Sequence, residues 1–264
     1  MKKTVVITGA YGVIGRAIAE MMAENDYALI LVGKDKLQLA ETSAEVARQS
    51  HTYDVKYVAV DLSSEKAIKE FADSLEEPVH VLINNAATTP LQRIETSEGI
   101  EMQWAVNVLA YMWMMMYLRP HIVKNGRIVN VASFYAGSLD LNDVEFKKRG
   151  YDNDTAYRQS KQANRMLSAF YAEQFKPYEI TVNSCHPGEI SSKLSNSLGF
   201  HFPDPPRKGA DTPVWLATSK ELEGVTGQYF QYRKNIRCQF SQNKNKLKEL
   251  YELCQSYTKY TFDN

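Results

Sequence analysis

The chain has 264 residues, with 31 basic residues (Lys and Arg) balancing 31 acidic residues (Asp and Glu), and three cysteines. This length allows one α/β domain with a sizeable core, and the balanced charge argues against nucleic acid or an anionic membrane surface as the main partner. The cysteines are scattered without a CxxC pair, which suits a reducing compartment, so we expect a cytoplasmic protein without a disulfide framework or zinc site.

No targeting or membrane segment is expected. The first apolar stretch starts at Thr4, is only as long as a strand and ends in glycine, so it does not resemble a signal peptide. The strongest candidate for a membrane span, residues 104–118, is shorter than the roughly 18 residues that a span needs, and Asn107 interrupts it. A buried or interface helix rich in methionine is the better interpretation. The five histidines show no metal-ligand spacing, so no metal site is predicted.

Short β-branched runs alternate with longer helical patterns along the chain. Strands are expected at 4–8, 27–33, 55–60, 79–83, 126–132, 179–185 and 227–232, with helices at 15–25, 36–49 and 65–75 after the first three. Strands that are apolar nearly throughout are buried on both faces, which is typical of a parallel sheet between two helical layers. The pattern predicts a Rossmann-like, doubly wound αβα sandwich with about seven parallel strands, in a single domain over residues 1–264.

A glycine-rich loop, "TGAYGVIG", joins the first strand to the first helix and contains Gly9, Gly12 and Gly15. Glycine lets the backbone approach a pyrophosphate closely, and the first N–H groups of the following helix point at that anion. The sequence therefore predicts that this loop holds a nucleotide pyrophosphate.

The end of the second strand indicates which nucleotide binds. NAD-binding folds usually carry an acidic residue there, whereas this chain has Gly33 followed by Lys34. A missing carboxylate and a nearby cation favour a 2′-phosphate, hence NADP(H), with Arg16 as a second contributor. NAD(H) stays open, because a shift of one residue brings Asp35 into the same place.

Tyr157 and Lys161 stand four residues apart on a predicted helix and so share one face. A nearby ammonium should lower the pKa of a tyrosine from its usual value near 10 and make it a better proton carrier. Ser133 ends a buried strand, at the edge of the sheet where such folds place their sites. A Tyr–Lys pair alone is more often a surface pair, so the catalytic interpretation depends on the combination.

The ordered series of motifs resembles the short-chain dehydrogenase/reductase (SDR) family over residues 4–234. Besides the glycine loop, it includes "VAVDL", "NNAA", "WAVN", "YRQSK" and "HPGEISSKL". Ser133 and Tyr157 lie 157 − 133 = 24 positions apart, wider than in most of the family, and the segment between them resembles the retinol-dehydrogenase-like and carbonyl-reductase branch.

The resemblance implies a catalytic tetrad of Asn107, Ser133, Tyr157 and Lys161. Tyr157 would transfer the proton, and Ser133 would hydrogen-bond the carbonyl oxygen where charge develops. Lys161 would bind the ribose hydroxyls and lower the pKa of Tyr157. Asn107 would hold a water molecule, although a buried asparagine that satisfies helix backbone explains this residue equally well.

The resemblance also implies a set of cofactor contacts. The expected cofactor-binding residues are Gly9, Tyr11, Gly12, Val13, Ile14, Gly15, Lys34, Asp61, Leu62, Asn85, Ala86, Tyr157, Lys161, Pro187, Gly188, Ile190 and Ser192. Three positions depart from the family pattern: Val13 replaces the central glycine, Ala87 the last residue of NNAG, and Ser192 a threonine. The resulting GxxGxxG spacing resembles the extended branch, which includes epimerases and dehydratases.

We therefore expect an NADP(H)-dependent oxidoreductase that transfers hydride between nicotinamide and a carbonyl or alcohol of a small, apolar substrate. Insertions near 138–154 and 191–208 should shape the substrate site. Five aromatic residues either line that site or only pack: Phe134, Tyr135, Phe200, Phe202 and Trp215. The alternatives are an extended-type epimerase or dehydratase and a non-catalytic NAD(P)-binding regulatory protein. Similar proteins often pair through the methionine-rich helix, which allows a homodimer, although monomers also occur.

Overall fold

The computed structural model describes residues 2–51, 54–202 and 204–260. Its strands form one sheet in the order β3-β2-β1-β4-β5-β6-β7-β8, in which β1 to β7 pair in parallel. The strands are β1 (Lys3–Thr8), β2 (Tyr27–Gly33), β3 (Val55–Ala59), β4 (Val79–Asn84), β5 (Ile122–Val131), β6 (Thr181–His186), β7 (Tyr229–Gln231) and β8 (Lys234–Asn235). The strand order reverses between β1 and β4, as in a doubly wound fold, and the predicted fold class is confirmed.

The sheet has eight strands rather than about seven, because β8 folds back antiparallel to β7. The two residues between them, Tyr232 and Arg233, have φ angles of 48° and 59°. Two-residue hairpins of this kind usually carry Asn or Gly at such positions, so the sequence "YR" gives no turn signal.

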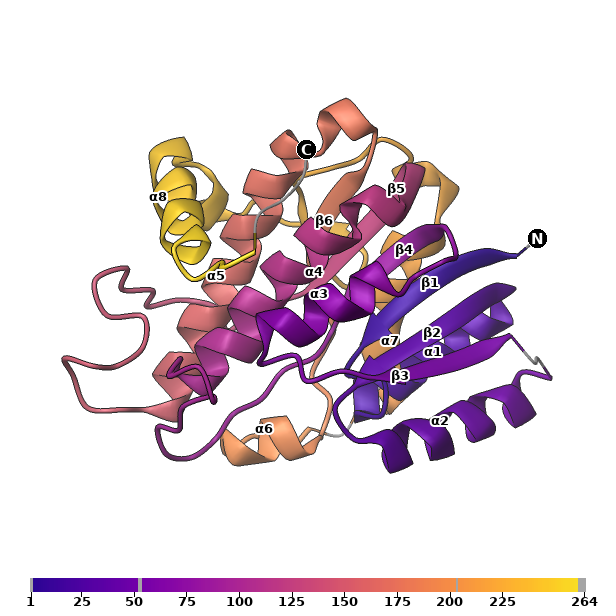
Figure 1. Cartoon of the computed structure of the whole chain (residues 1–264), viewed down its shortest axis with the longest axis horizontal. Coiled ribbons are helices and arrows are strands. Elements are labelled where there is room, and N and C mark those ends of the chain that lie inside the picture. Colours follow the sequence, from indigo (N-terminus) through magenta and orange to yellow (C-terminus); the bar gives the residue numbers. More distant parts are fainter. Residues whose placement is uncertain (1, 52–53, 203, 261–264) are drawn as a thin grey trace.

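Helices cover both faces of the sheet (Figure 1). They are α1 (Val13–Glu24), α2 (Lys36–Gln49), α3 (Glu65–Asp73), α4 (Ala110–Leu118), α5 (Asn153–Gln174), α6 (Lys193–Ser197), α7 (Pro206–Thr218) and α8 (Lys244–Gln255). Shorter helical turns are the π-helical η1 (Trp104–Leu109) and the 3₁₀ turns η2 (Arg119–His121), η3 (Lys176–Tyr178), η4 (Lys220–Leu222) and η5 (Gln239–Ser241). One hydrophobic core lies under α1, α2 and α7, and the other under α3, α4, α5 and α8.

The methionine-rich helix α4 is buried over its whole length. It packs against α3, whereas the π-helical turn η1 before it packs against α5, and the end of the chain crosses α4, where Trp113 Nε1 donates a hydrogen bond to Thr258 Oγ1 at 3.1 Å. The methionines of α4 are therefore core residues of a single chain. Among the described residues, no helix has both the length and the apolar character needed to cross a membrane.

Candidate active site

The carboxyl ends of the central strands bring the predicted site residues to one edge of the sheet. Gly9 follows β1, Asn85 follows β4, Ser133 lies two residues after β5, and Pro187 follows β6. In open parallel sheets, ligands bind at this edge, at the point where the strand order reverses.

The glycine loop is shaped for close approach of an anion. Gly9 has φ +64°, and a Cβ there would lie 2.7 Å from the Cα of Ala86. A Cβ on Gly15 would lie 2.1 Å from the Gly9 carbonyl oxygen, so both positions require glycine. Gly12 is the N-cap of α1, and no described side chain caps that helix. The N–H groups of its first turn therefore remain available to a phosphate.

Val13, which stands where the family has a glycine, is the first residue of α1, and its side chain is 39% exposed. The turn therefore accommodates a side chain at this position. Thr8 ties the loop to its neighbour, because its Oγ1 accepts hydrogen bonds from the Asn85 N–H (2.9 Å) and the Ala86 N–H (3.1 Å). Sequence reasoning did not single out Thr8 as a functional residue, since a threonine at the end of a strand carries no distinctive signal.

The other end of the expected nucleotide site lies beyond β2. Lys34 Nζ is 2.9 Å from Asp61 Oδ2, and both side chains are partly exposed. Arg16 pairs with Glu45 at 2.6 Å. The Asp35 carboxylate caps α2 by accepting hydrogen bonds from the backbone of residues 37 and 38, so it faces its own helix.

Other predicted cofactor contacts take part in local packing. The Tyr11 ring covers Gly33, where a Cβ would lie 2.6 Å from Tyr11 Cε1. Ile14 and Ile190 both approach Gly209 of α7. Leu62 and Ala86 are buried in the core on the α4 side of the sheet.

Tyr157 and Lys161 lie on α5, both buried, and face the end of β5. The Ser133 hydroxyl lies close enough to the Tyr157 hydroxyl to favour its ionised form. Lys161 Nζ donates to the Val131 carbonyl at 3.0 Å and lies 5.8 Å from the centroid of the Tyr157 ring. The structure thus brings together the serine, the tyrosine and the lysine that the motifs singled out.

The protonation states of this cluster differ from the sequence-based expectation. Burial raises the pKa of Tyr157 to about 12, and the neighbouring Ser133 hydroxyl offsets this only in part. Burial also lowers the pKa of Lys161 to about 7. The prediction that Lys161 lowers the pKa of Tyr157 is therefore wrong for the protein alone, because desolvation disfavours the charged forms of both groups.

Asn107 lies in η1 and is fully buried. Its Oδ1 accepts a hydrogen bond from the Thr88 N–H at 2.8 Å, and its Nδ2 donates to the Thr88 carbonyl at 3.0 Å and to Ser160 Oγ at 3.3 Å. The side chain therefore fixes the loop after β4 against α5, rather than satisfying the backbone of its own helix.

The segment after β6 contains the predicted residues Pro187, Gly188, Ile190 and Ser192 and leads into α6. Ser192 caps α6 by accepting a hydrogen bond from the N–H of residue 195 at 3.2 Å. Helix α6 in turn contacts the neighbouring loops, because Ser197 Oγ lies 2.5 Å from Thr89 Oγ1 and its carbonyl accepts from Asn153. The segment thus closes against the start of α5, which carries Tyr157.

A group of aromatic rings lies beside Ser133. The ring centroids of Phe134 and His186 are 4.8 Å apart, and those of Tyr135 and Phe200 are 5.3 Å apart. Phe200 also stacks on Phe202, and Phe134 remains 46% exposed directly beside Ser133. Trp215 does not belong to this group, because it lies on α7 and packs against Phe230.

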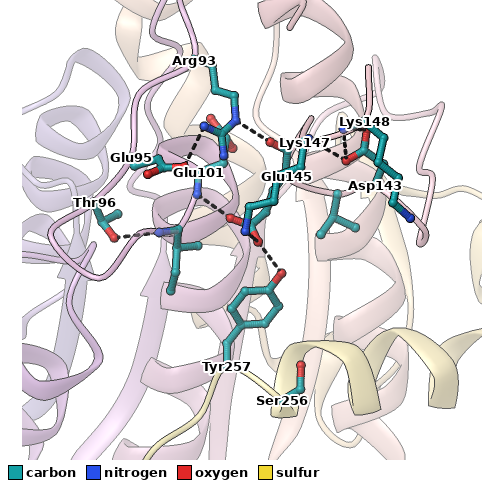
Figure 2. A network of polar contacts seen from close by, with 12 residues as sticks. Arg93, Glu95, Thr96, Glu101, Asp143, Glu145, Lys147, Lys148, Ser256 and Tyr257 are labelled. Atoms are coloured by element: carbon teal, nitrogen blue, oxygen red, sulfur yellow. Dashed lines mark hydrogen bonds and ion pairs between the residues drawn. The ribbon is translucent and has the colours of Figure 1, made fainter. Parts of the chain in front are cut away.

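Sequence reasoning missed a polar network that holds the segment between β5 and α5 in place (Figure 2). The Glu145 carboxylate accepts hydrogen bonds from the Glu101 N–H and the Tyr257 hydroxyl, both at 2.9 Å. The Glu101 carboxylate accepts from the backbone N–H groups of Gln103 and Trp104 at the start of η1. These hydrogen bonds therefore hold together the insertion, the end of the chain and the π-helix that carries Asn107. The sequence does not reveal them, because their partners lie far apart along the chain.

Residues 3–200 match the family model described as short chain dehydrogenase, and the chain belongs to this family. Retinol dehydrogenase 13 of Mus musculus is 30% identical over 250 residues, covering 86% of this chain and 75% of that protein. A protein of Streptomyces sp. (strain C5), named as a daunorubicin C-13 ketoreductase (DnrU), is 33% identical over 244 residues, covering 88% and 84%. The chain thus lies in the retinol-dehydrogenase-like branch.

Among solved structures, a short chain dehydrogenase from Burkholderia cenocepacia J2315 in complex with NADP has a TM-score of 0.71 and 19% identity, covering 87% of this chain and 95% of that one. This likeness concerns the fold. The family match and the curated relatives make the chain an NAD(P)-binding oxidoreductase that acts on alcohol and carbonyl groups.

Proposed function

We propose that the chain is an NADP(H)-dependent oxidoreductase that interconverts a carbonyl and a primary or secondary alcohol on a small, apolar substrate. The observation that carries this proposal is the buried cluster of Ser133, Tyr157 and Lys161 at the carboxyl edge of the sheet, beside the exposed face of Phe134.

Each member of the cluster has a distinct task in this proposal. Bound NADP(H) supplies or accepts the hydride. Tyr157 is protonated at neutral pH, since its pKa is about 12, so it can donate a proton to the carbonyl oxygen during reduction. Ser133 hydrogen-bonds the same oxygen as negative charge develops there. Lys161 binds the ribose hydroxyls, and Asn107 keeps the loop at Thr88 and a bridging water in place.

The residues around the glycine loop fit a dinucleotide. A Cβ on Gly9 would clash with Ala86, and a Cβ on Gly15 would clash with the Gly9 carbonyl oxygen, so the loop needs glycine at both positions. The N–H groups in the first turn of α1 have no side-chain cap among the described residues and can therefore bind the pyrophosphate. The proposed cofactor contacts are the seventeen residues named from the sequence.

NADP(H) is favoured over NAD(H) because no carboxylate follows β2 in the position that would bind a 2′-hydroxyl. Asp35 caps α2, whereas Lys34 is exposed and held by Asp61 near the end of that strand. A 2′-phosphate would draw Lys34, with Arg16 as the second cation. The NADP in the Burkholderia structure is consistent with this choice.

The apolar substrate is inferred from the aromatic rings beside Ser133. An apolar substrate that covers the exposed Phe134 ring would bury its surface and so bind favourably. The names of the relatives, a retinol dehydrogenase and a ketoreductase, agree with an apolar alcohol or ketone. We further propose that the chain forms one domain whose loops at 138–154 and 191–208 shape this site. A homodimer remains a prediction.

The test is the turnover of Tyr157→Phe with NADPH and a panel of apolar aldehydes and ketones. We expect a loss of about a hundredfold or more in kcat, because the proton donor is removed. NADPH should still bind to this variant, as measured by fluorescence titration. Tyr178→Phe is the matched control, since that ring is 45% exposed and lies at η3, away from the site. Equal turnover in the two variants would refute the proposed function.

A further inference from the structure

Arg165 is a buried cation behind the catalytic serine. It lies on α5 one turn beyond Lys161 and is 7% exposed. Its guanidinium donates hydrogen bonds to the Ser133 carbonyl and to the Tyr229 hydroxyl, the latter at 2.6 Å, and it lies 3.6 Å from the centroid of the Tyr229 ring. No carboxylate in the described part of the chain forms an ion pair with it. A buried charge held by such partners is costly to maintain, so its contact with Ser133 calls for an explanation.

The Ser133 peptide lies just beyond the regular sheet. The ladder between β5 and β6 ends with the bond from the Ala132 N–H to the Cys185 carbonyl, at 2.7 Å. One residue later the chain leaves the sheet, and a strand partner no longer fixes the Ser133 carbonyl. Arg165 supplies that partner, while the Tyr135 N–H donates to Ser133 Oγ at 3.1 Å.

We propose that Arg165 is a positioning residue, which holds the Ser133 peptide so that the serine hydroxyl meets Tyr157. The planar guanidinium suits this task, because it reaches the carbonyl and the Tyr229 hydroxyl at the same time and stacks on the Tyr229 ring. The catalytic consequence depends on the proposed function, whereas the position of Ser133 does not.

The kinetic test compares Arg165→Met with Arg127→Met. Arg127 is a suitable control, because it is half-buried and donates to two backbone carbonyls, those of Leu216 and Ser219. It lies in the middle of β5, and its hydrogen bonds go to the end of α7 rather than to Ser133. We expect Arg165→Met to lower kcat on the order of tenfold to a hundredfold through loss of alignment, with little change in the affinity for NADPH. Arg165→Lys should restore part of that loss, and a kcat in Arg165→Met equal to that of Arg127→Met would overturn the proposal.

A crystal structure of Arg165→Met separates this proposal from the proposed function. We expect the Ser133 hydroxyl to leave Tyr157, and an unmoved serine would refute the positioning role whatever the enzyme turns over. If Arg165→Met does not fold, Tyr229→Phe gives the same test, because it removes one acceptor of the guanidinium. The same comparison of Ser133 in that variant then decides the outcome. Absence of turnover in the unmodified protein would count against the proposed function alone.

Discussion

At the scale of single residues, burial controls the direction in which the Tyr157 proton moves most readily. With a pKa of about 12, Tyr157 is an acid that stays protonated at neutral pH, so it is ready to donate during carbonyl reduction. In alcohol oxidation it must first lose that proton. We therefore expect kcat/KM for oxidation to rise as pH increases from 7 to 10, whereas kcat/KM for reduction should not rise over this range. Initial rates in both directions across these pH values test this, and an oxidation profile that is flat with pH would contradict it.

Lys34 is the residue from which we infer the choice of cofactor. Its ammonium is exposed and paired with Asp61, so a 2′-phosphate would gain an attraction of roughly 1 kcal/mol, about fivefold in affinity. Lys34→Ala should therefore weaken NADPH binding by about that factor and leave NADH binding nearly unchanged. Lys36→Ala is the control, because Lys36 is an exposed lysine on the neighbouring turn of α2. Equal losses for both cofactors in fluorescence titrations would show that Lys34 does not recognise the phosphate.

The sequence could place Tyr157 and Lys161 on one helical face, because helix geometry fixes the relation between residues four apart. It could not give their pKa values, which depend on how much of the surrounding chain buries them. Arg165 was missed for a related reason. An arginine in a polar helix usually faces solvent, and only the folded chain shows that this one reaches Ser133.

At the scale of elements, the strands and helices were largely predictable, since apolar runs and helical periods are local signals. β2 and α2 have the predicted bounds, whereas β8 was missed because its turn lacks Gly or Asn. The position of the glycine loop was also predictable. The role of each glycine could not be predicted, because it depends on how close Ala86 and the Gly9 carbonyl lie to that glycine in the folded chain.

This geometry predicts different effects for alanine substitutions at Gly15 and at Gly12. A Cβ on Gly15 would lie 2.1 Å from the Gly9 carbonyl oxygen, whereas a Cβ on Gly12 would lie 3.3 Å from the same atom. Gly15→Ala must displace the loop, and we expect it to destabilise the fold by about 1–3 kcal/mol, as overpacking does, and to abolish NADPH binding. Gly12→Ala requires a shift of only a few tenths of an ångström and should retain most of the affinity. Urea denaturation and cofactor titration of the two variants measure both effects; equal behaviour would exclude the geometric argument.

At the scale of the whole molecule, the C-terminal segment (256–260) joins parts that are distant in sequence. Its backbone N–H at Lys259 donates to the buried Glu65 carboxylate at 2.8 Å, where the Tyr117 hydroxyl also donates at 2.5 Å. Tyr257 contacts Glu145 of the insertion, and Thr258 contacts Trp113 of α4. The segment thus covers part of helix α4 and ties it to α3 and to the insertion.

This role can be measured by ending the chain at Gln255. The deletion leaves Glu65 without the Lys259 N–H and uncovers Trp113, so we expect a loss of about 2–5 kcal/mol in the free energy of unfolding. For a chain of this size that corresponds to a fall in Tm of roughly 5–15 °C, measured by calorimetry. The variant should also self-associate in sedimentation experiments, since an apolar face becomes exposed. Lys259→Ala is the control, because it removes an exposed ion pair with Glu98 but keeps the N–H that Glu65 binds. If the truncated chain has the same Tm as this control, the C-terminal segment does not stabilise the fold.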